Sequence, residues 1–121
     1  MSRFVVIREA AAGWTAGRGT LEQPELAEHS AFMNELAEQG FLLLAGPLAG
    51  SELDRIRALL IVEADDEAEI AQRLAGDPWA HANKLKTVSV ASWNVFVGGE
   101  RLAPRGQSAL AYFSAEPASN S

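Results

Sequence analysis

The sequence predicts an α+β domain whose elements follow the order β-α-β-β-α-β, and three observations support this prediction. Four short runs rich in Val, Ile, Leu and aromatic residues have the length of strands. Two stretches with helical periodicity separate the first strand from the second and the third from the fourth. A chain of 121 residues with 48% hydrophobic and 21% charged residues is typical of one globular domain. The expected strands are 4–8, 41–44, 58–63 and 86–97, and the expected helices run from Pro24 to Gln39 and from Asp66 to Gly76.

The first helix has a start signal, a stop signal and an apolar stripe. Pro24 suits the first helical position, where the missing N–H is harmless, and Gly40 suits the left-handed position after the last turn. At about 100° per residue, His29 falls near the middle of the apolar stripe. The helix therefore turns an imidazole toward the core. The stripe consists of Leu26, Phe32, Met33, Leu36 and Ala37.

Local signals also bound the middle elements. The run 41–44 is closed by Gly46-Pro47, so we expect a short buried strand there. Asp66 and Glu69 have the spacing of a capping box that opens the second helix. Asp77-Pro78 then prevents the helix from continuing, because a residue before proline avoids the α region. The Gly-rich stretch 13–19 lacks the Gly-Lys-Ser/Thr of a phosphate loop, and we expect a flexible loop.

The last strand shows a change of phase. Val88 and Val90 alternate in one phase, whereas Trp93, Val95 and Val97 alternate in the other. One extra residue at a β-bulge would re-aim the side chains beyond it and explain this switch. We take residues 1–97 as the domain and 98–121 as a partly disordered C-terminal extension. Within the extension, 110–113 would dock as a short strand or strap, and 115–121 would form a frayed tail.

This element order is that of the ferredoxin-like fold, in which two helices cover one face of a four-stranded antiparallel sheet. The pairs Leu42/Leu44 and Leu59/Ile61 leave apolar residues on the other face as well. We therefore expect a second subunit to pack sheet against sheet, giving a homodimer.

Composition excludes several classes of function. The net charge of −6 and the scattered cations give no electrostatic reason to bind nucleic acid or an anionic membrane. The absence of cysteine excludes disulfides, thiol catalysis and zinc–thiolate sites. The apolar run Phe4–Ile7 is too short for a signal peptide or a membrane span, so we expect a cytoplasmic protein.

Candidate chemistry centres on His29 and Asp77. Taken alone, His29 is more often a packed core residue, and Asp77 before proline is more often a turn element that accepts backbone N–H bonds. Taken together they would form a general base, because a carboxylate that accepts the imidazole N–H fixes the tautomer and stabilises the charged form. Sequence alone does not give the distance between them.

Three further residues are candidates for substrate binding. Trp79 would line a pocket that accepts aromatic compounds, with core filling as the alternative. Arg8, at the end of the first strand, would pair with an anionic group unless it is solvated. Ser51 lies in the loop after Gly46-Pro47 but in no Gly-x-Ser-x-Gly elbow, so a serine hydrolase is not expected. We expect no metal, because the spacings of the histidines and Asp77 match no compact ligand motif, and no cofactor.

Several segments together resemble the YCII-related family. The typical marks are a His in the first helix, Gly-Pro after the second strand and Asp-Pro after the second helix, and all three are present over roughly residues 3 to 97. The departures from the family pattern are the stretch 10–21 and the tail beyond Gly98, either of which would reshape or cover a cleft. The matching segments are 28–33, 36–41, 45–48, 75–79 and 88–90 with Trp93.

The resemblance implies a fold and a site. It places the chain in the dimeric α+β barrel superfamily of ferredoxin-like folds, with His29 and Asp77 as the active-site pair in a cleft near the dimer interface. One branch of the family resembles a dehydrochlorinase that acts on a chlorinated, hydroxylated aromatic, which implies proton abstraction followed by loss of chloride. The alternative is a dimer that binds a small ligand without chemistry, or one in which the pair is purely structural.

Overall fold

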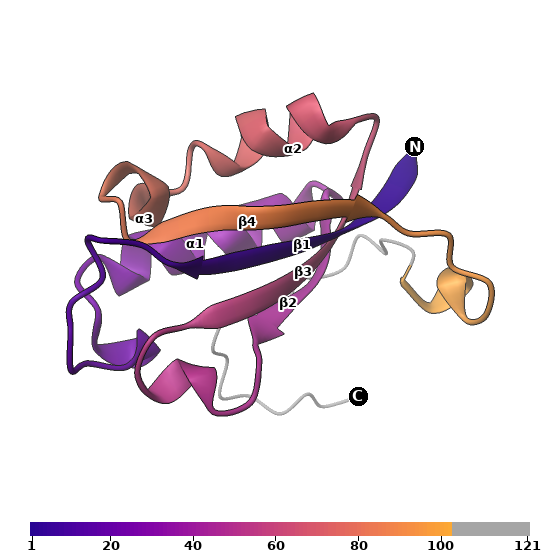
Figure 1. The fold of residues 1–121 in the computed structure, drawn as a ribbon. Helices are drawn as coiled ribbons and strands as arrows, with labels where there is room; N and C mark the ends of the chain where they lie inside the picture. Colours follow the sequence, from indigo (N-terminus) through magenta and orange to yellow (C-terminus); the bar gives the residue numbers. More distant parts are fainter. Residues whose placement is uncertain (103–121) are drawn as a thin grey trace.

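The computed structural model describes residues 1–102 and confirms the ferredoxin-like α+β fold (Figure 1). The four-stranded sheet has the order β2-β3-β1-β4, and every neighbouring pair is antiparallel. The expectations for 110–113 and 115–121 lie outside the described residues. The strands are β1 (Ser2–Ala10), β2 (Leu42–Pro47), β3 (Arg57–Ala64) and β4 (Leu85–Ser92), and the helices are α1 (Leu26–Glu38), α2 (Glu67–Leu74) and the one-turn α3 (Pro78–His81).

The core lies between one face of the sheet and the helices. Alternate residues of β1, from Phe4 to Ala10, are buried, as expected of a strand with one face turned to the core. Helix α1 adds Met33 and Leu36, and α2 adds Ile70 and Leu74, to the same buried cluster. All three helices therefore cover the same face, and the side chains that point into this layer are the ones available for a buried site.

Helix α1 begins later than the sequence predicts. Pro24 is not its first residue; the helix starts at Leu26, after Glu25 in the left-handed region with φ 65°. The carbonyl of Pro24 instead accepts a hydrogen bond from Trp79 Nε1 at 2.8 Å. The predicted end is confirmed, because Gly40 has φ 82°, the conformation that favours glycine after a helix.

Strand β2 runs through the dipeptide that was expected to end it. Gly46 and Pro47 pair with Leu59 and Ala58 of β3. Proline is tolerated here because β2 is an edge strand, and an edge strand needs no N–H donor on its outer side. This extension brings Ala45, Gly46 and Pro47 to the wall of a pocket described below.

The signals around α2 are confirmed, and one helix was missed. Asp66 Oδ1 accepts a bond from Glu69 N at 2.9 Å, and the Glu69 carboxylate accepts one from Asp65 N at 2.8 Å. After this helix ends, Pro78 begins the single turn of α3 at its first position. Asp77 is the N-cap of α3, a role that the Asp-Pro pair is well suited to fill.

The bulge in β4 exists, but the predicted position was wrong. Ile7 pairs with Ser89 and Arg8 with Thr87, so Val88 is the extra residue. The strand ends at Ser92, and Trp93 to Val97 form no continuation of it. The apparent second phase is therefore not a strand pattern, and Phe96 is 92% exposed.

The Gly-rich stretch after β1, expected to be a flexible loop, is held by hydrogen bonds from buried polar side chains. Gln23 accepts a bond from Thr15 N at 2.9 Å and donates to Arg18 O at 2.9 Å. The buried Lys84 donates from Nζ to Gly13 O at 3.0 Å and to Gln23 Oε1 at 3.3 Å. These bonds fix the loop at the end of the sheet where α3 lies.

Gly13→Ala should destabilise the fold by about 1–3 kcal/mol, because a Cβ there would lie 2.4 Å from Ala82 O, a backbone atom that cannot move away alone. Urea denaturation monitored by tryptophan fluorescence measures this. The matched control is Gly46→Ala, where a Cβ meets nothing within 4 Å and the change should stay within about 0.5 kcal/mol. Equal stabilities of the two variants would contradict the prediction.

Candidate functional site

Three elements bring polar side chains together around the carboxylate of Asp77. This side chain is fully buried, as are those of Arg8 on β1 and His29 on α1 to within a few per cent. Asp77 Oδ2 accepts a bond from Arg8 Nη1 at 2.8 Å, and Oδ1 lies 2.8 Å from His29 Nδ1. His29 and Asp77, whose separation the sequence does not give, are therefore in direct contact.

Local structure fixes the orientation of the carboxylate. As the N-cap of α3, Asp77 accepts a bond from Trp79 N at 2.9 Å. This confirms the expectation that the carboxylate accepts a backbone N–H, and the two roles coexist in one side chain. With donors from α3, α1 and β1 on its oxygens, the carboxylate is well solvated by the protein although no water reaches it.

The pKa of Asp77 reflects two opposed effects. Burial by itself raises the pKa of this carboxyl, but the hydrogen bonds from His29 and Arg8, together with the positive charge beside it, outweigh burial and hold the pKa below the ordinary 3.8. Asp77 is therefore ionised at neutral pH. Since an ionised carboxylate only accepts hydrogen bonds, His29 Nδ1 carries a proton.

Trp79 supports the imidazole from behind. The two rings are stacked with their centroids 3.9 Å apart and an angle of 7° between their planes. The indole is held by its own bond to Pro24 O and by an edge-on contact with the Trp14 ring at 5.7 Å. The stacked indole therefore fixes the position of the imidazole ring.

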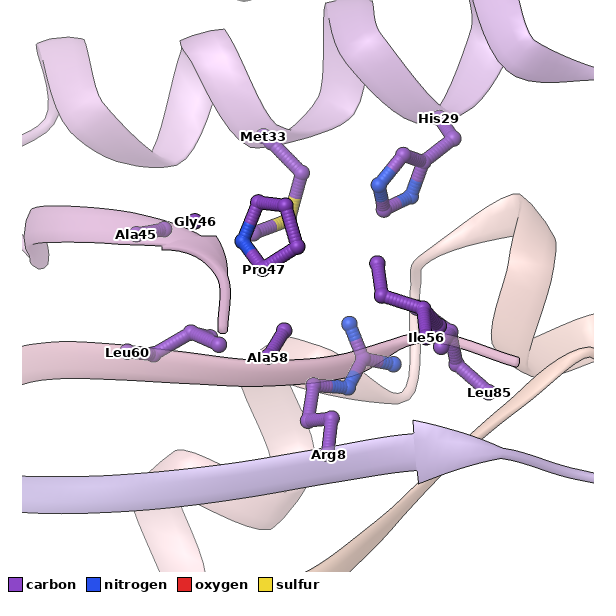
Figure 2. Close-up of a pocket in the computed structure, with 10 residues that line it drawn as sticks. All are labelled: Arg8, His29, Met33, Ala45, Gly46, Pro47, Ile56, Ala58, Leu60 and Leu85. Carbon is purple, nitrogen blue, oxygen red and sulfur yellow. The ribbon is translucent and has the colours of Figure 1, made fainter. Parts of the chain in front are cut away.

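A small pocket of about 20 Å³ lies between α1 and the sheet, with His29 on one wall and Arg8 on the opposite one (Figure 2). That volume holds about one water molecule. Apart from the two polar side chains, the lining is apolar or small. It consists of Met33, Ala45, Gly46, Pro47, Ile56, Ala58, Leu60 and Leu85.

The structure brings four of the five sequence-predicted residues together. His29 and Arg8 line the pocket, Asp77 joins them, and Trp79 lies fully buried behind His29. Trp79 is not in the pocket wall. Ser51 lies elsewhere, with its hydroxyl 2.7 Å from Leu48 O and 3.1 Å from Arg57 O, where it secures the turn between β2 and β3.

Sequence reasoning missed the Arg8–Asp77 ion pair and most of the apolar lining. The ion pair joins residues 69 positions apart, so no local pattern contains it. Among residues 1–102, no three side chains of His, Cys, Asp or Glu gather as a metal site would require. In the same residues, no helix is long and apolar enough to cross a bilayer.

Asp77→Asn should lower the free energy of unfolding by about 3–5 kcal/mol at pH 7, because it leaves the buried Arg8 charge unpaired. The loss should shrink at acid pH. A carboxyl whose folded-state pKa is depressed stabilises the fold above about pH 3.8, and this contribution disappears as pH falls through the folded pKa.

Urea unfolding at pH 7, 5 and 3 measures both effects. The control is Asp65→Asn at an exposed site, which should stay within about 0.5 kcal/mol of the wild type. A constant difference between wild type and Asp77→Asn down to pH 3 would contradict the depressed pKa.

Comparison with known proteins identifies the family and supports the fold. Among solved structures, the chain is similar to the 5-chloro-2-hydroxyhydroquinone dehydrochlorinase of Burkholderia phenoliruptrix AC1100 in complex with 2,5-dihydroxybenzoquinone. The two are 21% identical, with a TM-score of 0.53 over 76% of this chain and 93% of the other, so the likeness concerns the fold. No curated protein matches the sequence. The model of the YCII-related domain, in contrast, matches residues 3–94, and the protein therefore belongs to that family.

Proposed function

We propose that this protein is an enzyme in which His29 and Asp77 perform general acid–base chemistry on a small hydroxylated compound. One observation carries the proposal: the bond between His29 Nδ1 and Asp77 Oδ1, at 2.8 Å, in a ring that also forms a pocket wall. This is the arrangement that a buried imidazole needs in order to act as a base.

In this proposal each group has one role. Asp77 keeps the proton on Nδ1, so Nε2 is the atom that would take a proton from the substrate. When it does, the new positive charge lies beside the carboxylate and against the face of Trp79. Arg8, by holding Asp77 ionised, makes that stabilisation available at neutral pH.

Elimination is the reaction class that we favour. The similar solved structure is a dehydrochlorinase of a chlorinated hydroxyhydroquinone, a reaction whose net change is the loss of HCl. A base opposite an apolar wall suits such a step, because the proton needs an acceptor and the rest of the ring needs only van der Waals contact. Chlorinated hydroxyhydroquinones are the compounds to assay first.

His29→Gln should lower kcat on a substrate found in this way by about 10²–10⁴-fold, because glutamine fills similar space but accepts no proton at neutral pH. Chloride release or quinone absorbance measures turnover. The control is His81→Gln, at an exposed position on α3, which should keep the wild-type rate. Full turnover by His29→Gln would overturn the proposal.

A purely structural role for the pair is the second candidate, and the deep burial of both side chains favours it. The bond ties α1 to the start of α3, so its loss would cost about 1–3 kcal/mol of stability. The melting temperature of the His29→Leu variant distinguishes a functional pair from a purely structural one. A variant more stable than the wild type argues for a functional pair, and a strongly destabilised one argues for a structural tie.

We further propose a homodimer formed through the open face of the sheet. Val5 and Ile7 of β1 pair with Ile61 and Leu59 of β3, which places an apolar centre on the face away from the helices. Leu44, paired with Ile61, is 53% exposed. One ion pair lies at each end of this apolar centre. The partner surface in the proposed dimer would therefore have an apolar centre and a polar rim that match it. These pairs are Arg3–Glu63 at 3.1 Å and Arg57–Glu9 at 3.4 Å.

Ile7→Lys should convert the dimer to a monomer, because the new ammonium would be buried between the two sheets. Sedimentation velocity at micromolar concentration measures the oligomer, and circular dichroism checks the fold. The control is Leu21→Lys, since Leu21 is 62% exposed in the 3₁₀ turn Thr20–Glu22 and should leave the dimer intact. A monomeric wild type would overturn the dimer.

A further inference from the structure

We infer that Arg8 holds the substrate oxygen on which negative charge develops, so the substrates are small carbonyl or phenol compounds whose deprotonated form is an oxyanion. The inference rests on the proposed function, since it names the substrate class of the same site. It also assigns Arg8 a direct contact with substrate, in addition to its ion pair with Asp77.

The first argument is that the Arg8 guanidinium has a hydrogen-bond donor with no acceptor among the described residues. Arg8 is 2% exposed, and within residues 1–102 only Nη1 makes a hydrogen bond, to Asp77. Nε is buried and has no hydrogen-bond partner in the part of the chain that the structure describes. A buried cationic donor left unsatisfied is costly, and native cores rarely retain one. A ligand oxygen that accepts from the guanidinium would relieve this cost.

The second argument is the direction of the side chain. Figure 2 shows the Arg8 guanidinium rising from β1 toward the pocket, while His29 points down from α1 on the other side. The remaining lining is apolar or small, so Arg8 is the cation that a polar ligand group would meet in this pocket. A planar guanidinium binds an oxyanion more tightly than a neutral oxygen.

The third argument is the order of charges. In the resting site the charges of Arg8 and Asp77 neutralise each other. Proton removal from a carbon next to a carbonyl moves the C–H electron pair into a new C=C bond and the carbonyl π pair onto oxygen, while the proton goes to His29 Nε2. Nothing is oxidised or reduced. The result is an alternating row of oxyanion, Arg8, Asp77 and imidazolium, in which each charge has an opposite neighbour.

Titration with formate, compared with neutral formamide, tests the inference. The two probes match in heavy atoms and shape and differ in charge. In ¹⁵N-labelled wild-type protein, formate should shift the Arg8 Nε–H signal saturably, and formamide should not. The Nε–H of Arg57, which is 55% exposed, reports non-specific ionic effects. Equal responses to both probes, or no response to either, would overturn the inference.

Two variants separate this inference from the proposed function. Arg8→Lys should weaken formate binding by roughly tenfold or more, since an ammonium lacks the planar fork of donors. His29→Gln should still bind formate, because the anion contacts Arg8. If His29→Gln also keeps full turnover, the acid–base proposal fails while the Arg8 assignment stands. If formate does not bind but turnover still requires His29, the Arg8 assignment fails while the acid–base proposal stands.

Discussion

The carboxylate of Asp77 is the constraint on which the site depends. It has no contact with water, so its charge requires donors supplied by the protein. Those donors come from β1, α1 and the first turn of α3, and each is fixed by the same bonds that satisfy the carboxylate. The position of α1 over the sheet, the start of α3 and the tautomer of His29 are therefore set together. A shift of any one of these elements would leave a buried charge without a partner.

This arrangement has a thermodynamic cost that bears on its purpose. Replacing a buried ion pair by apolar residues of similar volume is often neutral or stabilising. The surrounding core, with Val6, Leu60 and Ile70 almost fully buried, would accept such residues readily. A fold that needed only to join α1 to the sheet would be served by a leucine at position 29. The meeting of three polar side chains beside a pocket supports the proposed chemistry.

Local patterns predicted the elements and the direction of His29. They failed for features that depend on contacts between residues far apart in the sequence. The stripe on α1 depends on spacing within one helix, and the capping box of α2 depends on two residues three apart, so both can be found in sequence. The passage of β2 through Pro47 depends on its being an edge strand, which is a property of the whole sheet. The Arg8–Asp77 pair likewise needs the topology that lays β1 beneath the end of α2. The turn of α3 was the exception, because its Asp-Pro start is a local signal that we interpreted only as a stop.

His29 and Arg8, on opposite walls of the pocket, are both bonded to the carboxylate of Asp77. This shared partner limits the chemistry that the site can perform. Asp77 is bonded to both His29 and Arg8, so in the proposed reaction a positive charge formed on His29 would compete with Arg8 for the same carboxylate. The Arg8 donors would then be less compensated when the substrate becomes negative, and under the proposal their attraction for an oxyanion would increase at that stage. An interaction that strengthens as the proton moves lowers the barrier rather than the ground state. Hence the Arg8–Asp77–His29 row suits reactions that begin with proton loss next to an oxygen, and it offers little to reactions that build positive charge on the substrate.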